Sequence, residues 1–364
     1  MPFDQGSVTC RVCLLPQPMP KDALDRFAAK AGGDLAAVRD EPVWGWVARH
    51  LLETRIDEET AYRGGYLSLT LRQAQRKIPA SLLQAECRME ELSRMAEKNS
   101  ESISRKEKKA IKEEVSERLL PKMPPQVSGI SFVVDESSER LYVSATSDTQ
   151  LDTFLGYFRD TVGFEPIALT PEVAAPDLYS VNPDVVPTLN VSPSISDGQA
   201  SGTLGQDFLT WLWWYQEAHE GKLPKSQLGE FGLLVDGPLV FVAEGPGAHE
   251  SAIRKGLPTL SAEAKAALEV GKKLKRAKLM FARGNDAWNA TIDADGLIIR
   301  GLKLPQGEAL DPDSVFEERI TNLHIFQTLL YALFNRYLQE MTDETQAKKV
   351  AESAKKWVKS MDGK

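Results

Sequence analysis

Apolar residues recur at helical spacing in two consecutive runs between positions 78 and 119, and this pattern constrains the fold more than any other feature of the chain. The first run has alternating steps of four and three residues, which is typical of a helix packed against another helix. Its members are Ile78, Leu82, Ala85, Met89, Leu92 and Ala96. The second run is Ile111, Val115 and Leu119, and it ends before Pro121. The sequence therefore predicts a helical hairpin at residues 78–125. Because each helix has one narrow apolar side, we expect the hairpin to project as an arm.

Strand patterns lie on both sides of this hairpin. Alternating, β-branched and aromatic residues predict strands at 8–12, 43–47 and 66–71 before it, and at 130–134, 141–143 and 164–169 after it. Helical spacing predicts helices at 21–30 and 151–158. These elements form an N-terminal α+β unit made of residues 1–77 and 126–172, into which the hairpin is inserted.

The second half of the chain predicts another α+β unit. Six prolines between 166 and 193, followed by serines and glycines, predict a linker at 173–206. Beyond it, residues 207–344 form the C-terminal unit, and residues 345–364 form a charged tail, helical or frayed. Helices are expected in this unit at 208–215, at 261–273 and from about 313. Strands are expected at 231–235 and 239–242 with a turn at Asp236-Gly237, followed by a meander at 274–282, 288–292 and 297–304 with turns at Gly284-Asn285 and Asp295-Gly296. The predicted fold class is α+β with mixed antiparallel sheets.

Composition narrows the cellular setting. The 364 residues include no run of the roughly 20 apolar residues that a membrane-spanning helix needs, and the N-terminus lacks the pattern of a secretion signal. Three cysteines cannot form a disulfide framework, which fits a reducing compartment. We therefore expect a cytoplasmic protein that does not bind membranes.

Cys10 and Cys13 have the spacing of a redox pair or of half a zinc site. A structural zinc needs four ligands, and the sequence offers no second Cys/His pair. A redox pair of this spacing sits at a helix N-terminus, whereas positions 10 and 13 of a strand point to opposite faces. We interpret both as incidental strand cysteines. The segment 293–296 begins like a calcium loop, but a hairpin turn explains it better, because the sixth position is Ile298 where the loop needs glycine.

The sequence also lacks the motifs of phosphate-binding loops, serine hydrolases and zinc proteases. It therefore predicts no cofactor, no metal and no catalytic constellation, and we expect a protein that is not an enzyme.

Five aromatic residues crowd into eight positions at Phe208, Trp211, Trp213, Trp214 and Tyr215. Such a cluster can offer stacking platforms for bases. On a helix, however, Phe208, Trp211 and Tyr215 share one face that would anchor the helix to a sheet. The packing interpretation is favoured, and we expect Trp213 and Trp214 to lie partly outside the packed face.

Charge is distributed unevenly along a chain whose formal net charge is -8. Residues 254–283 contain nine basic and two acidic side chains, whereas residues 165–250 contain two basic and twelve acidic ones. A basic surface on an acidic protein attracts a polyanion locally while the rest repels it. Candidate phosphate contacts in this segment are Arg254, Lys255, Lys272, Lys273, Lys275, Arg276 and Lys278. We expect the 272–278 cluster to have almost no acidic partners.

The predicted hairpin adds a second basic group near its turn, namely Lys98, Arg105, Lys106, Lys108, Lys109 and Lys112. Each can reach a phosphate. The alternative is a solvated helix face with pairs at i,i+4, which Glu97, Glu101, Glu107 and Glu113 would supply. The sequence leaves both interpretations of the hairpin open.

The hairpin and its surroundings resemble the RdgC family of bacterial recombination-associated proteins. The matching features are Gly45-Trp46-Val47, Lys77-Ile78-Pro79 at the start of the long helix, the basic segment 104–108, the segment 111–115, Leu119-Leu120-Pro121, and the ending Pro166-Ile167-Ala168-Leu169. The resemblance resumes from about Leu260, through 269–272 and the meander, to the C-terminal helix. Members tend to carry LLPRAF where this chain has Leu119-Leu120-Pro121-Lys122-Met123-Pro124. The segment 170–205 and the tail after Thr342 look like additions.

This resemblance implies an α+β protein that forms a ring-shaped homodimer with a basic inner surface. Such rings encircle double-stranded DNA without sequence specificity and limit access of the RecA recombinase, which would place the protein at the nucleoid. The family's basic arm tip corresponds to Arg105, Lys106 and Lys108, the basic loop near the ring contact to Arg254 and Lys255, and the GK element to Gly271 and Lys272. The alternative hypothesis is a protein-interaction scaffold without direct DNA binding.

Overall fold

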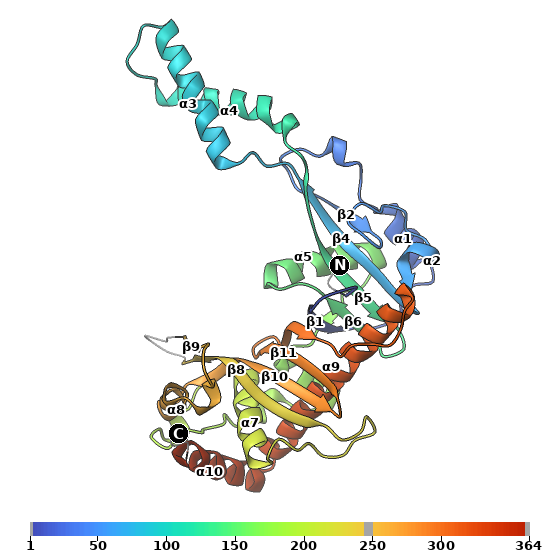
Figure 1. Ribbon diagram of the computed structural model, residues 1–364, viewed down its shortest axis with the longest axis vertical. Coiled ribbons are helices and arrows are strands. Elements are labelled where there is room, and N and C mark those ends of the chain that lie inside the picture. The colour runs from blue at the N-terminus through green and yellow to red at the C-terminus, as the bar shows by residue number, and fades with distance from the viewer. Residues whose placement is uncertain (1–2, 244–249, 361–364) are drawn as a thin grey trace. The chain divides into compact units, whose positions relative to one another are not determined.

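The computed structural model describes residues 3–243 and 250–360, and the chain divides into two compact units (Figure 1). Residues 20–61 and 68–130 form what we call the hairpin unit. Residues 1–19, 62–67 and 131–364 form the sheet unit. Both contain helices and antiparallel strands, so the predicted α+β class is confirmed. The division differs from the predicted one, because residues 131–172 belong to the same compact unit as the C-terminal half.

In the hairpin unit, β2 (Val43–Val47) pairs with the 70–74 part of β4 (Tyr66–Gln75), and α1 (Ala23–Ala29) and α2 (Glu58–Ala61) lie beside them. The ring of Phe27 meets that of Trp46 edge-on, with centroids 5.0 Å apart. A glycine is required at position 45, since a Cβ there would lie 2.5 Å from the Cα of Gly32. The predicted strands at 43–47 and 66–71 and the helix within 21–30 are therefore present.

Two helices, α3 (Ala80–Glu97) and α4 (Arg105–Leu119), pack against each other as the sequence predicts, and the short helix η2 (Leu120–Lys122) follows. Ser104 caps α4 by accepting a hydrogen bond from the backbone N–H of Glu107, whose side chain accepts one from the N–H of Ser104. Between the helices lie the buried side chains of Ile111, Val115 and Leu119, with Leu83 and Cys87 packed on them.

The predicted apolar seam of α3 is wrong after Leu82. Met89 is 70% exposed and Leu92 is 46% exposed. The face that meets α4 instead carries ion pairs between the helices: Arg118 Nη2 lies 2.9 Å from Glu86 Oε2, and Arg94 pairs with Glu114. Ala85, Met89, Leu92 and Ala96 are exposed and do not belong to the apolar cluster between the two helices.

The sheet unit is built on a large antiparallel sheet. The strand order is β6 (Arg140–Val143), β1 (Val8–Leu14), β12 (Ile298–Lys303), β11 (Asp286–Asp293), β10 (Lys273–Arg283), β8 (Gly232–Val242) and β9 (Ser251–Ile253). The 132–135 part of β5 (Gln126–Asp135) pairs with β6, β7 (Ile167–Ala168) pairs with β1, and β3 (Tyr62–Arg63) pairs with the start of β4. The predicted meander and its two turns are confirmed.

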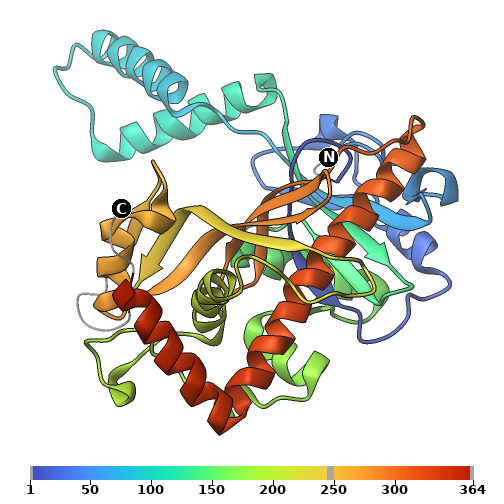
Figure 2. The same cartoon turned by 60° about the horizontal axis from the view of Figure 1, so that its bottom comes forward.

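Helices cover one face of this sheet (Figure 2). α7 (Leu204–Ala218) and α9 (Pro312–Thr342) pack on it, and α10 (Glu344–Ser360) closes over α7. Further helices of the unit are α5 (Asp148–Val162), α6 (Pro171–Tyr179) and α8 (Ala262–Glu269). None of the helices in the described ranges is both long and apolar enough to cross a membrane.

The aromatic cluster of α7 belongs to the core, as the packing interpretation predicted. The expectation that Trp213 and Trp214 lie partly outside the packed face is wrong, since they are 0% and 7% exposed. Trp213 packs between Phe241 of β8 and Trp357 of α10, while Trp211 stacks on Tyr215. The helix is enclosed on both sides because the C-terminal helix, predicted only as a charged tail, covers the side that the sheet leaves open.

Three further predictions differ from the structure. The segment 173–206 is a packed part of the sheet unit and not a free linker, because its prolines limit regular hydrogen bonding without preventing burial, and Leu189 and Val191 are each 1% exposed. The expected hairpin at 231–242 is one strand, β8, whose two halves both pair with β10 through a shifted register. The helix expected at 261–273 ends at Glu269, before Gly271 in the left-handed conformation (φ +81°). The last four residues of the predicted tail lie outside the described ranges.

Candidate nucleic-acid interface

The six basic residues predicted on the hairpin are all exposed, and half of them are ion-paired. Lys98 pairs with Glu107, Lys108 Nζ lies 4.0 Å from Glu91 Oε2, and Lys109 Nζ lies 3.7 Å from Glu113 Oε1. Hydrogen bonds from Lys98 and Ser104 lower the pKa of the Glu107 carboxyl to about 2, so this carboxylate is ionised at neutral pH. The i,i+4 alternative therefore holds for Lys109.

Arg105, Lys106 and Lys112 differ from the other three. Each is exposed, and no carboxylate in the described part of the chain lies within 4.0 Å of its charged group. Arg105 and Lys106 stand in the first turn of α4, where the capping box fixes the backbone. Their positive charges are available to an external anion.

A groove of about 730 Å³ runs between α3 and α4. Arg88, Lys108 and Lys112 line it together with one carboxylate, Glu91. Arg88 Nη1 lies 3.3 Å from Glu91 Oε2, so Arg88 and Lys108 share that carboxylate and the groove keeps an excess of positive charge. Arg88 was not among the predicted contacts, and its place became visible only once the face of α3 that meets α4 was known.

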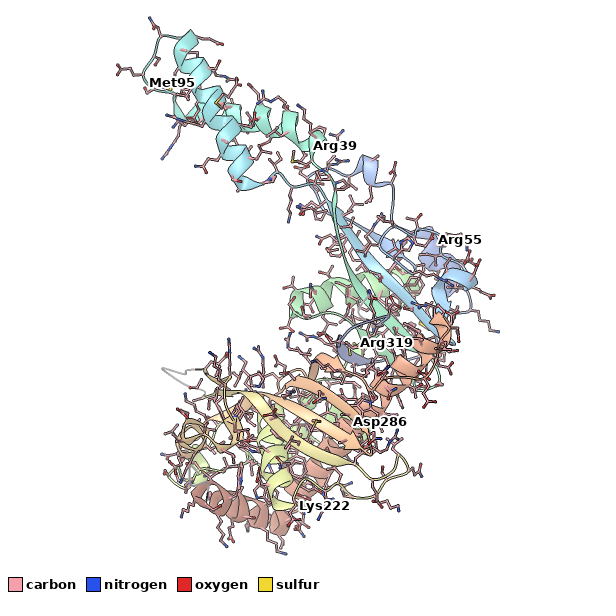
Figure 3. The ribbon with its side chains drawn as sticks, viewed as in Figure 1. Arg39, Arg55, Met95, Lys222, Asp286 and Arg319 are labelled. Atoms are coloured by element: carbon pink, nitrogen blue, oxygen red, sulfur yellow. The ribbon has the colours of Figure 1, made fainter. Side chains whose placement is uncertain are left out.

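A second groove of about 810 Å³ lies at the base of the hairpin and is lined by three basic residues, Arg39, Arg76 and Lys77, and by two acidic ones, Asp40 and Glu117. Arg76 donates from Nε to the carbonyl of Val38 at 2.8 Å and from Nη1 to the carbonyl of Met123, which fastens the end of the hairpin to β4. Arg39 (Figure 3) and Lys77 are exposed. The sequence analysis missed these three basic residues because Arg39 lies 37 positions before Arg76.

In the sheet unit, the expectation that the 272–278 cluster has almost no acidic partners is wrong. Lys275 Nζ lies 3.2 Å from Glu250 Oε2, Arg276 Nε lies 2.8 Å from Asp293 Oδ2, and Lys278 Nζ lies 3.9 Å from Asp236 Oδ2. The carboxylates of Asp293 and Asp236 come from β11 and β8, which flank β10. Partners across a sheet are distant in sequence, so the local charge count did not include them.

The prediction that Lys273 contacts phosphate is wrong. Its side chain is 3% exposed and pairs with Asp207 of α7, which is 4% exposed. Asp207 Oδ2 also accepts from the backbone N–H of Leu189 at 3.1 Å. Lys273 therefore joins β10, α7 and the segment 187–190 inside the core, and its ammonium group does not face an external phosphate.

Asp293 serves two cations. Arg276 Nε and Arg300 Nη2 lie 2.8 Å and 3.4 Å from the same oxygen, Oδ2. The Asp293 side chain is 8% exposed, whereas Arg276 and Arg300 are 37% and 31% exposed. One carboxylate cannot neutralise two guanidinium groups, so this part of the sheet keeps a positive charge. Arg300 was not predicted, because it lies on β12, outside the basic segment.

The remaining predicted contacts lie beside β9. Arg254 and Lys255 are exposed, and neither has an ion-pair partner in the described ranges. Lys272 is half-buried and donates from Nζ to Ser251 Oγ at 2.6 Å. These three residues form the unneutralised part of the basic segment.

Cys10 and Cys13 lie fully buried on β1. Burial raises the pKa of the Cys13 thiol to about 12 and raises that of Cys10 further above its ordinary range. Both thiols are therefore protonated at neutral pH, which opposes a redox role, because the thiolate is the reactive form. Within residues 3–243 and 250–360, no three His, Cys, Asp or Glu side chains are grouped so that they could hold a metal ion.

Taken together, the fold and these surfaces define an α+β protein whose helical hairpin and sheet edge carry cations that have no carboxylate partner among the described residues. Residues 23–178 match the family model described as "Putative exonuclease, RdgC". This part of the chain is thus similar to the RdgC family, which confirms the resemblance seen between positions 45 and 169. The resemblance from Leu260 onward lies beyond the match and stays a prediction.

Two curated relatives support the family. The chain is 28% identical over 104 residues to the recombination-associated protein RdgC of Pseudoalteromonas atlantica, covering 29% of this chain and 34% of that protein. It is 26% identical over 108 residues to the recombination-associated protein RdgC of Psychromonas ingrahamii, covering 30% and 35%. The aligned part spans about a third of the length of each relative.

Proposed function

We propose that this protein binds double-stranded DNA without sequence specificity and acts in homologous recombination. The observation that carries the proposal is the exposure of Arg105, Lys106 and Lys112 on a hairpin inside the matched domain, where no carboxylate of residues 3–243 and 250–360 pairs with them. Lysine and arginine that contact phosphates release condensed counterions, which supplies affinity for any duplex. Phosphate contacts position a protein without reading the bases.

The further features implied by the family are part of the same proposal. Two copies of the chain form a ring around the duplex, and the ring limits access of RecA to DNA. The net charge of -8 is compatible with this arrangement, because acidic outer surfaces repel DNA while the basic surfaces attract it. The protein would then be associated with the nucleoid.

The salt dependence of DNA binding tests the proposal. Fluorescence anisotropy with two unrelated duplexes, measured at several salt concentrations, should give similar affinities and a steep fall of affinity with salt. The variant Lys106→Ala/Lys112→Ala should lower the slope of log affinity against log salt by about 2, because each phosphate contact contributes about 0.9.

The matched control is Lys21→Ala/Lys122→Ala, which removes the same charge from exposed positions of the hairpin unit away from the hairpin turn. It should leave the slope unchanged. A wild-type affinity that does not respond to salt would refute the proposal.

A second candidate, exonuclease activity, is favoured by the description of the family model. An end-labelled duplex incubated with the protein and Mg²⁺ or Mn²⁺ tests it directly. Shortening of the label would establish the nuclease. An intact label together with salt-dependent binding would support the DNA-binding proposal alone.

A third candidate, a protein-interaction scaffold, is favoured by the exposed apolar stripe of Ala85, Met89, Leu92 and Ala96 on α3. Capture of partner proteins that survives nuclease and high salt, and that is lost in Met89→Gln/Leu92→Gln, would establish it.

A further inference from the structure

Helix α10 presents several exposed lysines on one side. The helix holds five lysines and two glutamates, in a chain that is acidic as a whole. The lysines are Lys348, Lys349, Lys355, Lys356 and Lys359. Ala347, Val350, Ala354 and Val358 are buried on the opposite side, and Trp357 meets Trp213 edge-on at 5.0 Å. The apolar side fixes the helix on the sheet unit and thereby points the lysines outward.

Lys349 and Lys356 lie on this face, and the exposed Glu352 stands between them in the sequence. They are seven residues apart, which is close to two helical turns and about 10.5 Å along the axis. Both are exposed, and no carboxylate in the described ranges lies within 4.0 Å of either ammonium group. Lys348 is only loosely paired, with its Nζ 4.0 Å from Glu344 Oε2.

The surface continues onto α8. Lys265 Nζ donates to the backbone carbonyl of Lys359 at 3.4 Å, so a lysine of α8 adjoins the C-terminal end of α10. Lys265 also lies 3.9 Å from Glu269, and the exposed side chain of Lys359 extends the face of α10 beyond it. The lysines of α10 therefore form a band about three turns long on one surface of the sheet unit.

We propose that the α10 lysine face is a phosphate-binding surface for duplex DNA, additional to the hairpin. The inference rests on the proposed DNA-binding function and adds a contact outside the family domain. The separation of Lys349 and Lys356 is about three times the 3.4 Å axial spacing of phosphates along one strand. An interfacial membrane helix would need an exposed apolar side, and here that side is buried in the core. The wide separation and the absence of a free apolar side favour the DNA backbone.

The double variant Lys349→Ala/Lys356→Ala tests this inference in the full-length protein. Alanine favours the helix and neither side chain packs in the core, so the fold should be retained. The slope of log affinity for duplex DNA against log salt should fall by about 2 relative to wild type. The matched control is Lys222→Ala/Lys225→Ala, which removes the same charge from two exposed lysines of the same unit; Lys222 lies after α7 (Figure 3).

A second readout locates the contact. Lys356→Cys in a Cys87→Ser background leaves one accessible thiol, because Cys10 and Cys13 are buried. Labelled with a benzophenone maleimide, this position should photo-crosslink to duplex DNA, whereas Lys222→Cys in the same background should not.

The outcomes distinguish a failure of the α10 inference from a failure of the proposed function. If the wild type binds DNA with steep salt dependence but the α10 variant keeps the full slope and no crosslink forms, the inference is overturned and the proposed function stands. If polyglutamate competes for the crosslink and duplex DNA does not, the face binds an acidic protein and the inference is overturned as well. If the wild type shows no salt-dependent DNA binding, both fail.

Discussion

The buried ion pair of Lys273 and Asp207 allows a direct test of whether Lys273 belongs to the core and not to a DNA-binding surface. Lys273→Met removes one partner and leaves the carboxylate of Asp207 in the core, where the two side chains are 3% and 4% exposed. Breaking a buried ion pair in this way costs about 3–5 kcal/mol. The hydrogen bond from the Leu189 N–H still stabilises the carboxylate, so we expect the lower end, about 3 kcal/mol.

Urea denaturation followed by tryptophan fluorescence measures this loss, because Trp211, Trp213 and Trp214 lie on the same helix as Asp207. The double variant Lys273→Met/Asp207→Asn removes both charges and keeps an oxygen that can accept from Leu189. It should recover about 2 kcal/mol relative to Lys273→Met alone, since no unpaired charge remains.

Lys275→Met is the matched control on the same strand. Its ion pair with Glu250 is partly exposed, at 29% and 47% of the two side chains, so the loss should stay below about 1 kcal/mol. At a temperature where all variants are folded, Lys273→Met should keep the wild-type salt slope of DNA binding. A slope lowered by about 0.9 with unchanged stability would show that Lys273 contacts phosphate and would refute the assignment to the core.

Three further predictions concern the sheet and the hairpin. Asp293→Asn should steepen the salt dependence of DNA binding if the sheet face contacts the duplex, because two guanidinium groups lose their shared carboxylate; anisotropy measures the change. The free energy of unfolding should be insensitive to Cys10 and Cys13 below about pH 8.5 and should fall as the pH rises toward 12, because the unfolded thiols ionise first; urea denaturation of the Cys10→Ala/Cys13→Ala variant should show a weaker fall. Ile111→Ala should destabilise the hairpin by about 2–4 kcal/mol and Met89→Ala by less than about 0.5 kcal/mol, as measured by hydrogen exchange of α3 and α4.

The sequence predicted correctly those helices and strands that are specified by neighbouring residues alone. The meander at 273–303 was found because alternating apolar residues and two turn signals specify both strands and connections. The hairpin helices were found from spacing, and Ser104 and Glu107 show why α4 begins where it does. Family resemblance located the domain at 23–178 from motifs that fall within it.

Predictions were wrong where packing or burial depends on a segment that is distant in the sequence. The seam of α3 has the spacing expected for helix packing, yet the charges of α4 select a different face, which carries Glu86 and Arg94. The prolines of 173–206 predict a linker, but Leu189 is buried, and its backbone N–H donates a hydrogen bond to the Asp207 side chain of α7. Nothing in the local sequence reports either partner.

Counting charges along the sequence also misses distant partners. The ion pairs of the structure show which cations of residues 254–283 are not paired within the described ranges. Six of the nine cations between 254 and 283 have a carboxylate within 4.0 Å. On a strand, the neighbours of a lysine belong to other strands, so a count along the chain overestimates the free charge of β10. Arg254, Lys255 and Lys272 have no such carboxylate among the residues that the structure describes. Arg254 and Lys255 follow β9, and a hydrogen bond to Ser251 holds Lys272 beside the same strand. Electrostatic attraction for a polyanion in this segment is therefore concentrated at the edge of the sheet, and not along the strand where the basic residues are densest in sequence.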